Sequence, residues 1–391
     1  MKLAVFGASG FVGAALVERL TRETGMDVVI CINRLGNAWR FSRARIPVRS
    51  VDIMSSDQLV SVLDGVTHVV NCTRGGTGVM FQGLSNLLTA CREARVKRFV
   101  HLSSISVYGN PPPGDRMRED SPTNPEPGSY GWEKLRQDGM VEAAHDAGLD
   151  CVVLCPPNIS GIYSSFVYNV LSEMRSDTLA LVDGGNRPNS TVDVDNLVHA
   201  ILLSLNIAKG DGKRMFVTDG NGHTWKEMTN GLMELAQRSL PLANVAAENV
   251  VTPVATRAPL PSFWRSVKHL ASSEVREALR RDPRWARADA AVRQLVAKSG
   301  AKIEDRLRMS IEGPQRISKV AEQSRYSSRY MAVQKRGIWH DSDRARDAIG
   351  YAPVLSLPAS FARYAEWYRR MYGFGESFWP LANVIETFRA D

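Results

Sequence analysis

The sequence predicts an α/β protein with a parallel, doubly wound sheet, followed by a smaller and mostly helical C-terminal part. Over residues 1–155, short apolar runs alternate with stretches of helical periodicity. The apolar runs are nearly continuous, which is typical of parallel strands buried on both faces. The chain has 391 residues and is 44% hydrophobic, which is ordinary for a globular protein of two or three packed units.

Each element follows from its local pattern. The first helix has apolar residues at Val12, Leu16, Val17 and Leu20, a spacing that places them on one face. Six strands are expected at residues 3–7, 28–32, 48–53, 68–72, 98–103 and 151–154. Four helices are expected at residues 11–20, 56–63, 83–93 and 130–147.

A long loop and a basic stretch interrupt this alternation. Residues 110–129 are rich in proline and glycine, so no regular structure is expected there. Residues 257–336 hold 19 Lys and Arg against 8 Asp and Glu, and they carry the whole basic excess of a chain with net charge +8. Two interpretations of this stretch stay open, a surface for a polyanion and a set of solvated helices.

These changes in pattern predict the domain organisation. The first domain is expected over residues 1–155 and is rejoined by about 191–217. The second is expected over residues 156–391 and includes a basic, helix-rich insertion at about 240–336.

The rest of the composition narrows the class of protein. The five cysteines form no C-x-x-C pair, which favours a reduced, cytoplasmic compartment. The histidines are scattered without ligand spacing, so no metal site is expected. No apolar window reaches the length of a membrane span, and no zinc-finger or RNP signature indicates nucleic-acid binding.

Three glycines follow the first strand directly. Gly7, Gly10 and Gly13 form G-x-x-G-x-x-G at the start of a helix. The first permits a tight turn, the second lets the backbone approach a pyrophosphate, and the third allows close packing of helix and strand. The N–H groups at the helix start favour phosphates. The sequence therefore predicts a Rossmann-type dinucleotide site, whose other expected contacts from this turn are Ser9, Phe11 and Val12.

The end of the second strand indicates which dinucleotide binds. A carboxylate there would bind the ribose hydroxyls of NAD, but the positions are Asn33 and Arg34. Because guanidinium groups suit a 2′-phosphate, NADP is favoured, with NAD as the alternative. Asp52 and Ile53, after the third strand, are placed to contact the adenine, although Asp52 is also suited to cap the next helix.

A tyrosine and a lysine predict acid/base chemistry. Tyr130 and Lys134 stand four residues apart on a helix, so both side chains share one face. A nearby ammonium stabilises a phenolate, which then exchanges a proton with a substrate hydroxyl or carbonyl oxygen. Ser104, after the fifth strand, supplies a hydroxyl to hold that oxygen. The alternative interpretation is an ordinary surface pair on a helix.

Taken together, the motifs GASGFVG, VDIM, YGWEK, LCPPNISG and RPNSTVDVDNLVHA resemble those of the extended short-chain dehydrogenases/reductases, in the NAD(P)-dependent epimerase/dehydratase group. The resemblance covers about residues 1–235 and resumes near the end of the chain. It implies that Ser104 is the hydroxyl position, Tyr130 the acid/base and Lys134 the partner of the nicotinamide ribose. The remaining implied contacts are Cys72, Thr73 and Pro156 for the cofactor, and Asn158 and Arg187 for the substrate.

Several positions depart from the family pattern. The fourth strand ends in NCTRGG instead of a His-x-Ala-Ala type ending, Met80 falls near a common asparagine, and Cys155 replaces an arginine. Ile105 after Ser104 disfavours a dehydratase, in which an acidic residue usually stands there. These departures concern the substrate more than the cofactor.

The resemblance implies an NAD(P)-dependent oxidoreductase or epimerase that acts on a hydroxyl or carbonyl carbon of a nucleotide-activated sugar. A homodimer through the helices at 83–93 and 130–147 is also implied. The first alternative is an enzyme similar to 3β-hydroxysteroid dehydrogenases or dihydroflavonol reductases, acting on an apolar alcohol or ketone. The second is a non-catalytic sensor or scaffold that binds NADP.

Overall fold

The computed structural model describes residues 1–22, 26–42, 44–109, 116–220, 223–236, 240–250, 326 and 328–372. The chain divides into two compact units, one of residues 1–250 with 329–391 and the other of residues 251–328. The fold described below is that of the first unit. The expected helices of the basic stretch, up to residue 325, lie outside the described residues.

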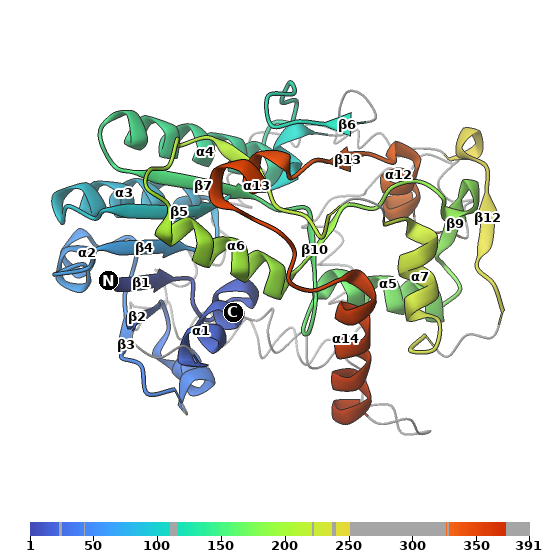
Figure 1. Cartoon of the computed structure of the whole chain (residues 1–391), viewed down its shortest axis with the longest axis horizontal. Coiled ribbons are helices and arrows are strands. Elements are labelled where there is room, and N and C mark those ends of the chain that lie inside the picture. Colours follow the sequence, from blue (N-terminus) through green and yellow to red (C-terminus); the bar gives the residue numbers. More distant parts are fainter. Residues whose placement is uncertain are drawn as a thin grey trace, which may run out of the picture. The chain divides into compact units, whose positions relative to one another are not determined.

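A seven-stranded parallel sheet forms the centre of this unit, in the strand order β11-β7-β5-β4-β1-β2-β3 (Figure 1). All six expected strands are present, and residues 214–216 add a seventh at one edge. The strand bounds are β1 Lys2–Phe6, β2 Asp27–Ile32, β3 Val48–Ser50, β4 His68–Asn71, β5 Arg98–Leu102, β7 Cys151–Cys155 and β11 Arg214–Phe216.

Helices cover both faces of the sheet, as a doubly wound fold requires. On one face, Leu16 of α1 and Leu197 of α6 belong to an apolar cluster with Val5 of β1. On the other, Leu59 of α2 and Leu87 of α3 pack with strand residues of opposite parity. The helix bounds are α1 Phe11–Arg22, α2 Ser56–Val62, α3 Leu84–Glu93, α4 Tyr130–Asp146 and α6 Val194–Asn206. Three short helices lie between these elements, η1 Leu35–Phe41, η2 Val79–Gly83 and η3 Ile105–Tyr108.

A second, mostly helical part packs around Trp225, which is fully buried. Its helices are α5 Ser165–Arg175, α7 Trp225–Leu232, α12 Ser328–Arg336 and α14 Leu357–Tyr372, with the short η4 Asp183–Gly185 and η5 Ala247–Asn249. The helix α13 Asp343–Ile349 instead packs on the sheet, where Ala345 and Ile349 join the apolar cluster of α1 and α6. Two two-stranded parallel sheets accompany them, β8 Asn158–Ser160 with β10 Thr191–Asp193, and β9 Ala180–Val182 with β12 Ala243–Val245.

The expectation for the loop at 110–129 is wrong in one detail. Within it, β6 (Arg116–Met117) pairs in parallel with β13 (Trp339–His340). These two residues precede the prolines of the second half of the loop, so their backbone N–H and C=O groups are free to bond to a distant strand. A pairing partner more than 220 positions away leaves no local sequence signal.

A buried amide fastens the C-terminal segment to the sheet. Asn196 of α6 accepts hydrogen bonds from the backbone N–H groups of Val354 and Leu355, each at 2.9 Å. Its Nδ2 donates to Asp219 at 2.7 Å and to the carbonyl of Leu355 at 2.8 Å. Since Asn196 has no exposed surface, these four bonds satisfy the whole side chain.

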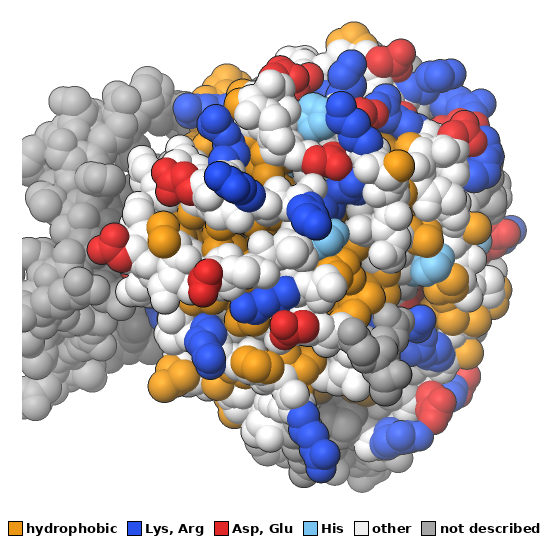
Figure 2. Space-filling view, turned by 60° about the vertical axis from the view of Figure 1, so that its left-hand side comes forward, with side chains coloured by type: hydrophobic (Ala, Val, Ile, Leu, Met, Phe, Trp, Pro, Cys, Tyr) orange, Lys and Arg blue, Asp and Glu red, His pale blue; other side chains and the backbone are white. Residues whose placement is uncertain are grey.

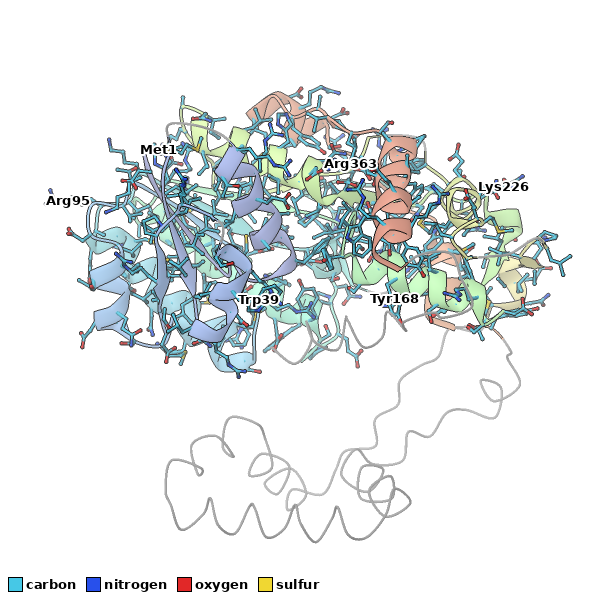
Figure 3. All side chains as sticks on the ribbon, turned by 90° about the horizontal axis from the view of Figure 1, so that it is seen from below. Met1, Trp39, Arg95, Tyr168, Lys226 and Arg363 are labelled. Carbon is cyan, nitrogen blue, oxygen red and sulfur yellow. The ribbon has the colours of Figure 1, made fainter. Side chains whose placement is uncertain are left out.

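The surface of the described residues carries both signs of charge. Figure 2 shows acidic and basic side chains interspersed on one face, with apolar side chains between them. In Figure 3, Arg95 lies at the end of the unit that holds α2 and α3, and Lys226 of α7 lies at the opposite end. Among the described residues, no helix is long and apolar enough to cross a membrane. All five cysteines are free thiols.

Candidate active site

The turn between β1 and α1 has a geometry that only glycine permits. Gly7 has φ +71°, and a Cβ there would come within 2.6 Å of the backbone carbonyl of Cys72. A Cβ on Gly13 would lie 2.3 Å from the carbonyl oxygen of Gly7. The turn closes with a hydrogen bond from the N–H of Gly10 to the carbonyl of Gly7, at 3.0 Å. At Gly7 and Gly13, therefore, the turn has no room for a side chain.

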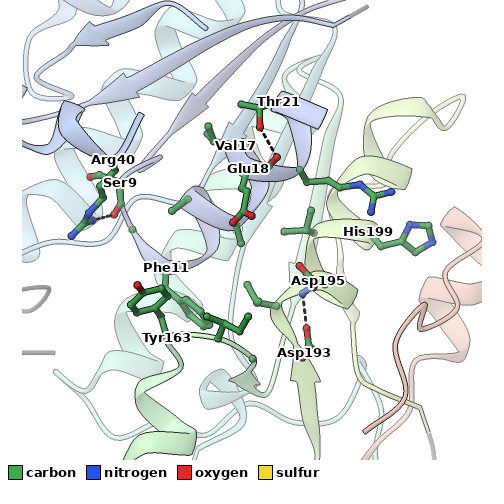
Figure 4. Close-up of a pocket in the computed structure, with 18 of the residues that line it drawn as sticks. Ser9, Phe11, Val17, Glu18, Thr21, Arg40, Tyr163, Asp193, Asp195 and His199 are labelled. Atoms are coloured by element: carbon green, nitrogen blue, oxygen red, sulfur yellow. Dashed lines mark hydrogen bonds between the residues drawn. The ribbon is translucent and has the colours of Figure 1, made fainter. Parts of the chain in front are cut away.

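This turn opens into a cleft of about 1580 Å³. Ser9, Gly10 and Phe11 line it on one side, and Arg74 and Tyr163 also contribute to its wall. In Figure 4, Phe11 and Tyr163 appear at one end of the cleft, and Arg40 donates a hydrogen bond to the carbonyl of Ser9. A glycine cradle at a helix N-terminus beside a cleft of this size fits the pyrophosphate of a dinucleotide.

The predicted adenosine contacts lie on two neighbouring loops. Asn33 and Arg34 are exposed directly after β2. Asp52 lies beyond β3, which ends at Ser50 and not at residue 53 as expected, and its carboxylate accepts a hydrogen bond from the N–H of Met54 at 2.9 Å. Ile53 is buried against Gly83. The exposed groups after β2 thus include a cation and no carboxylate.

The end of β4 forms the floor beside the glycine turn. Asn71 accepts hydrogen bonds from the backbone N–H and the hydroxyl of Thr73, at 3.1 and 2.6 Å. The N–H of Cys72 donates to the carbonyl of Phe6 at 2.9 Å, which ties this loop to β1. Burial raises the pKa of the Cys72 thiol to about 12, so it stays protonated and is no nucleophile at neutral pH.

Ser104, Tyr130 and Lys134 converge at the carboxyl edge of the sheet. Ser104 follows β5, and its hydroxyl accepts a hydrogen bond from the N–H of Ser106 at 3.2 Å. Tyr130 is the first residue of α4 and is 38% exposed. Lys134 is buried one turn further on, and its Nζ donates to the carbonyl of Leu102 at 2.8 Å. The Tyr130 side chain is therefore partly exposed, while the Lys134 ammonium is held against the sheet.

Burial dominates the protonation behaviour of these groups. It raises the pKa of Tyr130 above its usual range, while the Arg74 guanidinium and a hydrogen bond to Ser104 act in the opposite direction. Burial lowers the pKa of Lys134 to about 8, although the carboxyl of Asp138 opposes this. Lys134 is therefore mainly protonated at pH 7 and loses its charge in mildly alkaline solution.

A buried polar network lies behind Lys134, one helical turn further along α4. Asp138 accepts a hydrogen bond from Ser103 at 2.7 Å and pairs with Arg214 at 3.3 Å. Burial raises the pKa of Asp138 to about 6. Neither Asp138 nor Arg214 was predicted as a site residue from the sequence. The available signal was the spacing of Asp138, which stands four residues after Lys134 on the same helix face.

The remaining predicted residues, Pro156, Asn158 and Arg187, are not among the residues that line this cleft. Pro156 is buried after β7, and its carbonyl accepts a hydrogen bond from the N–H of Ile105 at 3.2 Å. Asn158 begins β8 and is half-buried. Arg187 bonds to the carboxylate of Asp183 at 2.8 and 2.9 Å and to the carbonyl of Lys335. Its guanidinium thus already has protein partners in this structure.

Arg74 is a further residue of the site that was not predicted from the sequence. Its guanidinium lies over the ring of Tyr130, 4.9 Å from the ring centroid. The signal was present as the NCTRGG departure after the fourth strand, which places a cation where the family pattern has small residues. Among the described residues, no group of three or more His, Cys, Asp or Glu side chains is arranged to hold a metal ion.

This fold and this glycine turn define a Rossmann-type dinucleotide-binding protein. The chain belongs to the NAD dependent epimerase/dehydratase family, whose model matches residues 3–217. It is 31% identical over 140 residues to a 4-hydroxy-2-methyl-3-oxo-4-farnesyl-3,4-dihydroquinoline-1-oxide ketoreductase of Stigmatella aurantiaca, covering 35% of this chain and 42% of the ketoreductase. It is 32% identical over 184 residues to a UDP-glucose 4-epimerase of Streptomyces lividans, covering 41% and 53%.

Solved structures share the fold over nearly the whole chain. The UDP-glucuronic acid 4-epimerase of Bacillus cereus, in complex with NAD, matches with a TM-score of 0.62 and 16% identity. That match covers 95% of this chain and 100% of the epimerase. The curated sequence matches span about half the length of those two relatives, so the comparisons establish family and fold, and the substrate is a separate question.

Proposed function

We propose that this protein catalyses NAD(P)-dependent hydride exchange at a hydroxyl or carbonyl carbon, with Tyr130 as the acid/base. The observation that carries the proposal is the convergence of Ser104, Tyr130 and Lys134 beside the glycine turn. Ser104 and the Gly7 turn follow the carboxyl ends of parallel strands, and α4, which carries Tyr130 and Lys134 in its first turns, begins at the same edge. Ligands of doubly wound sheets bind at this edge.

The cofactor would be held by the glycine turn and by backbone at the ends of β4 and β7. When bound, its nicotinamide accepts a hydride from an alcohol carbon or returns one to a ketone carbon. Tyr130 removes the proton from the substrate hydroxyl or returns it, and its partly exposed side chain lies under Arg74, which lines the cleft. The Ser104 hydroxyl orients the reacting oxygen. The buried Lys134 ammonium is directed toward the cofactor ribose in this proposal.

NADP is the proposed cofactor form. Arg34 and Asn33 are exposed after β2, where a carboxylate would favour NAD. Titration of the purified protein with NADPH and NADH measures this preference. We expect tighter binding of NADPH, and an Arg34→Ala variant is expected to lose that preference while NADH affinity stays the same. Equal affinities in the unaltered protein would contradict the assignment.

A nucleotide-activated sugar is the proposed substrate class. Support comes from the family, the matching UDP-glucose 4-epimerase and the shared fold of UDP-sugar epimerases. In this proposal Asn158 and Arg187 contact the substrate, and Arg187 exchanges its bond to Asp183 for a phosphate. A homodimer through α3 and α4 is part of the same proposal, and light scattering on the purified protein measures it.

A second candidate, an apolar alcohol or ketone, is favoured by a specific observation. Arg187 is held by Asp183 and by the carbonyl of Lys335, and the buried thiol of Cys155 stands where an arginine is common. Both features reduce the positive charge available to a diphosphate. Calorimetric titration with UDP separates the two substrate classes, since micromolar binding supports the sugar and no binding supports the apolar substrate.

Tyr130→Phe tests the catalytic proposal. The variant keeps the ring and removes the exchangeable proton, so we expect hydride exchange to fall by a factor of about a thousand or more. Cofactor affinity, measured by fluorescence titration, is expected to stay unchanged. Tyr163→Phe is the matched control, because Tyr163 is a tyrosine of similar exposure that lies on the β8–α5 loop and not on α4. Turnover of Tyr130→Phe at the normal rate would show that Tyr130 is not the acid/base, whereas retained function of this variant in cells without turnover would support a scaffold that binds the cofactor.

A further inference from the structure

Arg74 and Tyr130 form a close pair that the proposed chemistry has not used. The guanidinium carbon lies 4.9 Å from the centroid of the phenol ring, within the range of a cation–π contact. Arg74 is exposed and lines the cleft that begins at the glycine turn. Arg74 contacts Tyr130 from the loop after β4, whereas Lys134 is a residue of α4, the helix that also contains Tyr130.

The loop that carries Arg74 is fixed against the first turns of α4. Thr77 donates a hydrogen bond to Glu133 at 3.4 Å. Four positions after Thr77, Phe81 meets Trp132 edge to face, with ring centroids 6.1 Å apart. Arg136 lies over both of these rings, at 4.4 and 4.7 Å. These contacts hold the segment between β4 and α3 beside the helix turn on which Tyr130 stands.

The charged and titratable groups around the phenol do not act in the same direction. Arg74, on the β4 loop, is the strongest influence that lowers the pKa of Tyr130. Cys155 at the end of β7 and Asp138 of α4 raise it. Lys134 donates its hydrogen bond to the carbonyl of Leu102, and burial lowers its own pKa to about 8. A permanently charged guanidinium therefore acts on the phenol at any pH at which Lys134 has become neutral.

We propose that Arg74 is a positioning residue for Tyr130: its guanidinium lies on the phenol ring, fixes the ring beside the cleft that Arg74 lines, and stabilises the phenolate. This inference rests on the proposed role of Tyr130 as acid/base. The residue acts by charge, so it transfers no proton itself. This role also explains the departure from the family pattern after the fourth strand, because the arginine of NCTRGG is the residue that contacts Tyr130.

Titration of the phenol tests this directly and needs no substrate. The probe is the ultraviolet absorbance of tyrosinate, taken as the difference between a protein and the same protein with Tyr130→Phe. In Arg74→Ala, the pKa of Tyr130 is expected to rise by about one unit, because a neighbouring positive charge is lost. Arg74→Lys keeps the charge and is expected to restore most of the shift. Arg92→Ala removes an exposed cation at the opposite edge of the sheet and is expected to change nothing.

Turnover supplies the second measurement. Because the base form of Tyr130 is the phenolate, the rising limb of the pH profile of kcat/KM for alcohol oxidation is expected to move to higher pH in Arg74→Ala, by the same amount as the titration. An unshifted phenol in Arg74→Ala overturns the inference. A loss of cofactor affinity with an unshifted phenol also overturns it and makes Arg74 a phosphate ligand. A shifted phenol without turnover in any form supports the pairing and refutes the proposed function instead.

Discussion

At the scale of the residue, Gly7 shows how closely the turn and the β4 loop approach each other. Its positive φ already disfavours any other residue, and a Cβ would also meet the carbonyl carbon of Cys72 at 2.6 Å. Gly128 also has a positive φ, +77°, but its Cβ would meet nothing within 4 Å. An alanine at Gly128 would therefore introduce backbone strain alone, whereas an alanine at Gly7 would introduce backbone strain and steric overlap.

We expect Gly7→Ala to lower the free energy of unfolding by about 3 kcal/mol and to weaken NADPH binding at least tenfold. Gly128→Ala is expected to cost about 1 kcal/mol, from backbone strain alone, and to leave binding unchanged. Denaturant unfolding and fluorescence titration measure both quantities. Equal losses of stability in the two variants would show that the contact with Cys72 is easily relieved.

The same scale shows what the sequence could predict of the site. Two local spacings were sufficient to predict part of the site. The spacing of Gly7, Gly10 and Gly13 predicts a tight turn before a helix, and the spacing of Tyr130 and Lys134 places both side chains on one helix face. Arg74 reaches Tyr130 across the ends of two strands, so its partner follows from strand order and not from spacing. The engagement of Arg187 by the carbonyl of Lys335 spans 148 positions and likewise has no local signal.

At the scale of the element, α4 carries the site and contains two glycines in different surroundings. Gly131 lies one residue after Tyr130, and a Cβ there would come within 2.1 Å of the carbonyl oxygen of Ser106. Gly139 is exposed in the middle of the helix, and its Cβ would meet nothing within 4 Å. The first glycine lets α4 pack on η3, and the second only weakens the helix.

Gly139→Ala is therefore expected to raise the free energy of unfolding by about 0.5–1 kcal/mol, because alanine loses less backbone entropy in a helix. Gly131→Ala is expected to destabilise the protein and to reduce turnover, since it displaces the turn that bears Tyr130. Thermal and denaturant unfolding of the two variants check this. Stabilisation by Gly131→Ala would contradict the close packing of α4 on η3.

Within residues 1–155 most element positions were predicted, because buried parallel strands and amphipathic helices have strong periodic patterns. The end of β3 and the whole of β6 were not predicted, because both depend on pairing with another strand. Only three residues of β3 pair with β2, so the apolar residues that follow are buried without belonging to the strand. Residues 116–117 become a strand only because residues 339–340 lie beside them.

At the scale of the whole molecule, the chain leaves the described unit and returns to it at nearly the same place. Lys335 of α12 donates a hydrogen bond from Nζ to the carbonyl of Val250, at 3.0 Å. Tyr330 of the same helix is buried in the apolar cluster around Trp225. Residues 251–327 thus connect two positions that are already held together without them.

We expect that replacing residues 251–327 by a Gly/Ser linker of roughly eight residues leaves a folded protein with unchanged NADPH affinity. Thermal unfolding and fluorescence titration check this, with the full chain as the control. A change confined to the KM of the substrate would assign substrate recognition to the removed stretch. Failure of the shortened chain to fold would show that the core depends on it.

The hydrogen bonds of Asn196 have a consequence for folding during synthesis of the chain. The Asn196 side chain accepts hydrogen bonds from Val354 and Leu355, which are synthesised about 160 positions after it. Until then, a nascent chain that has already formed α6 exposes a polar group that cannot be satisfied in a closed core. Chains truncated before residue 354 are therefore expected to be prone to aggregation and to bind chaperones, because the core around Asn196 closes only with these residues.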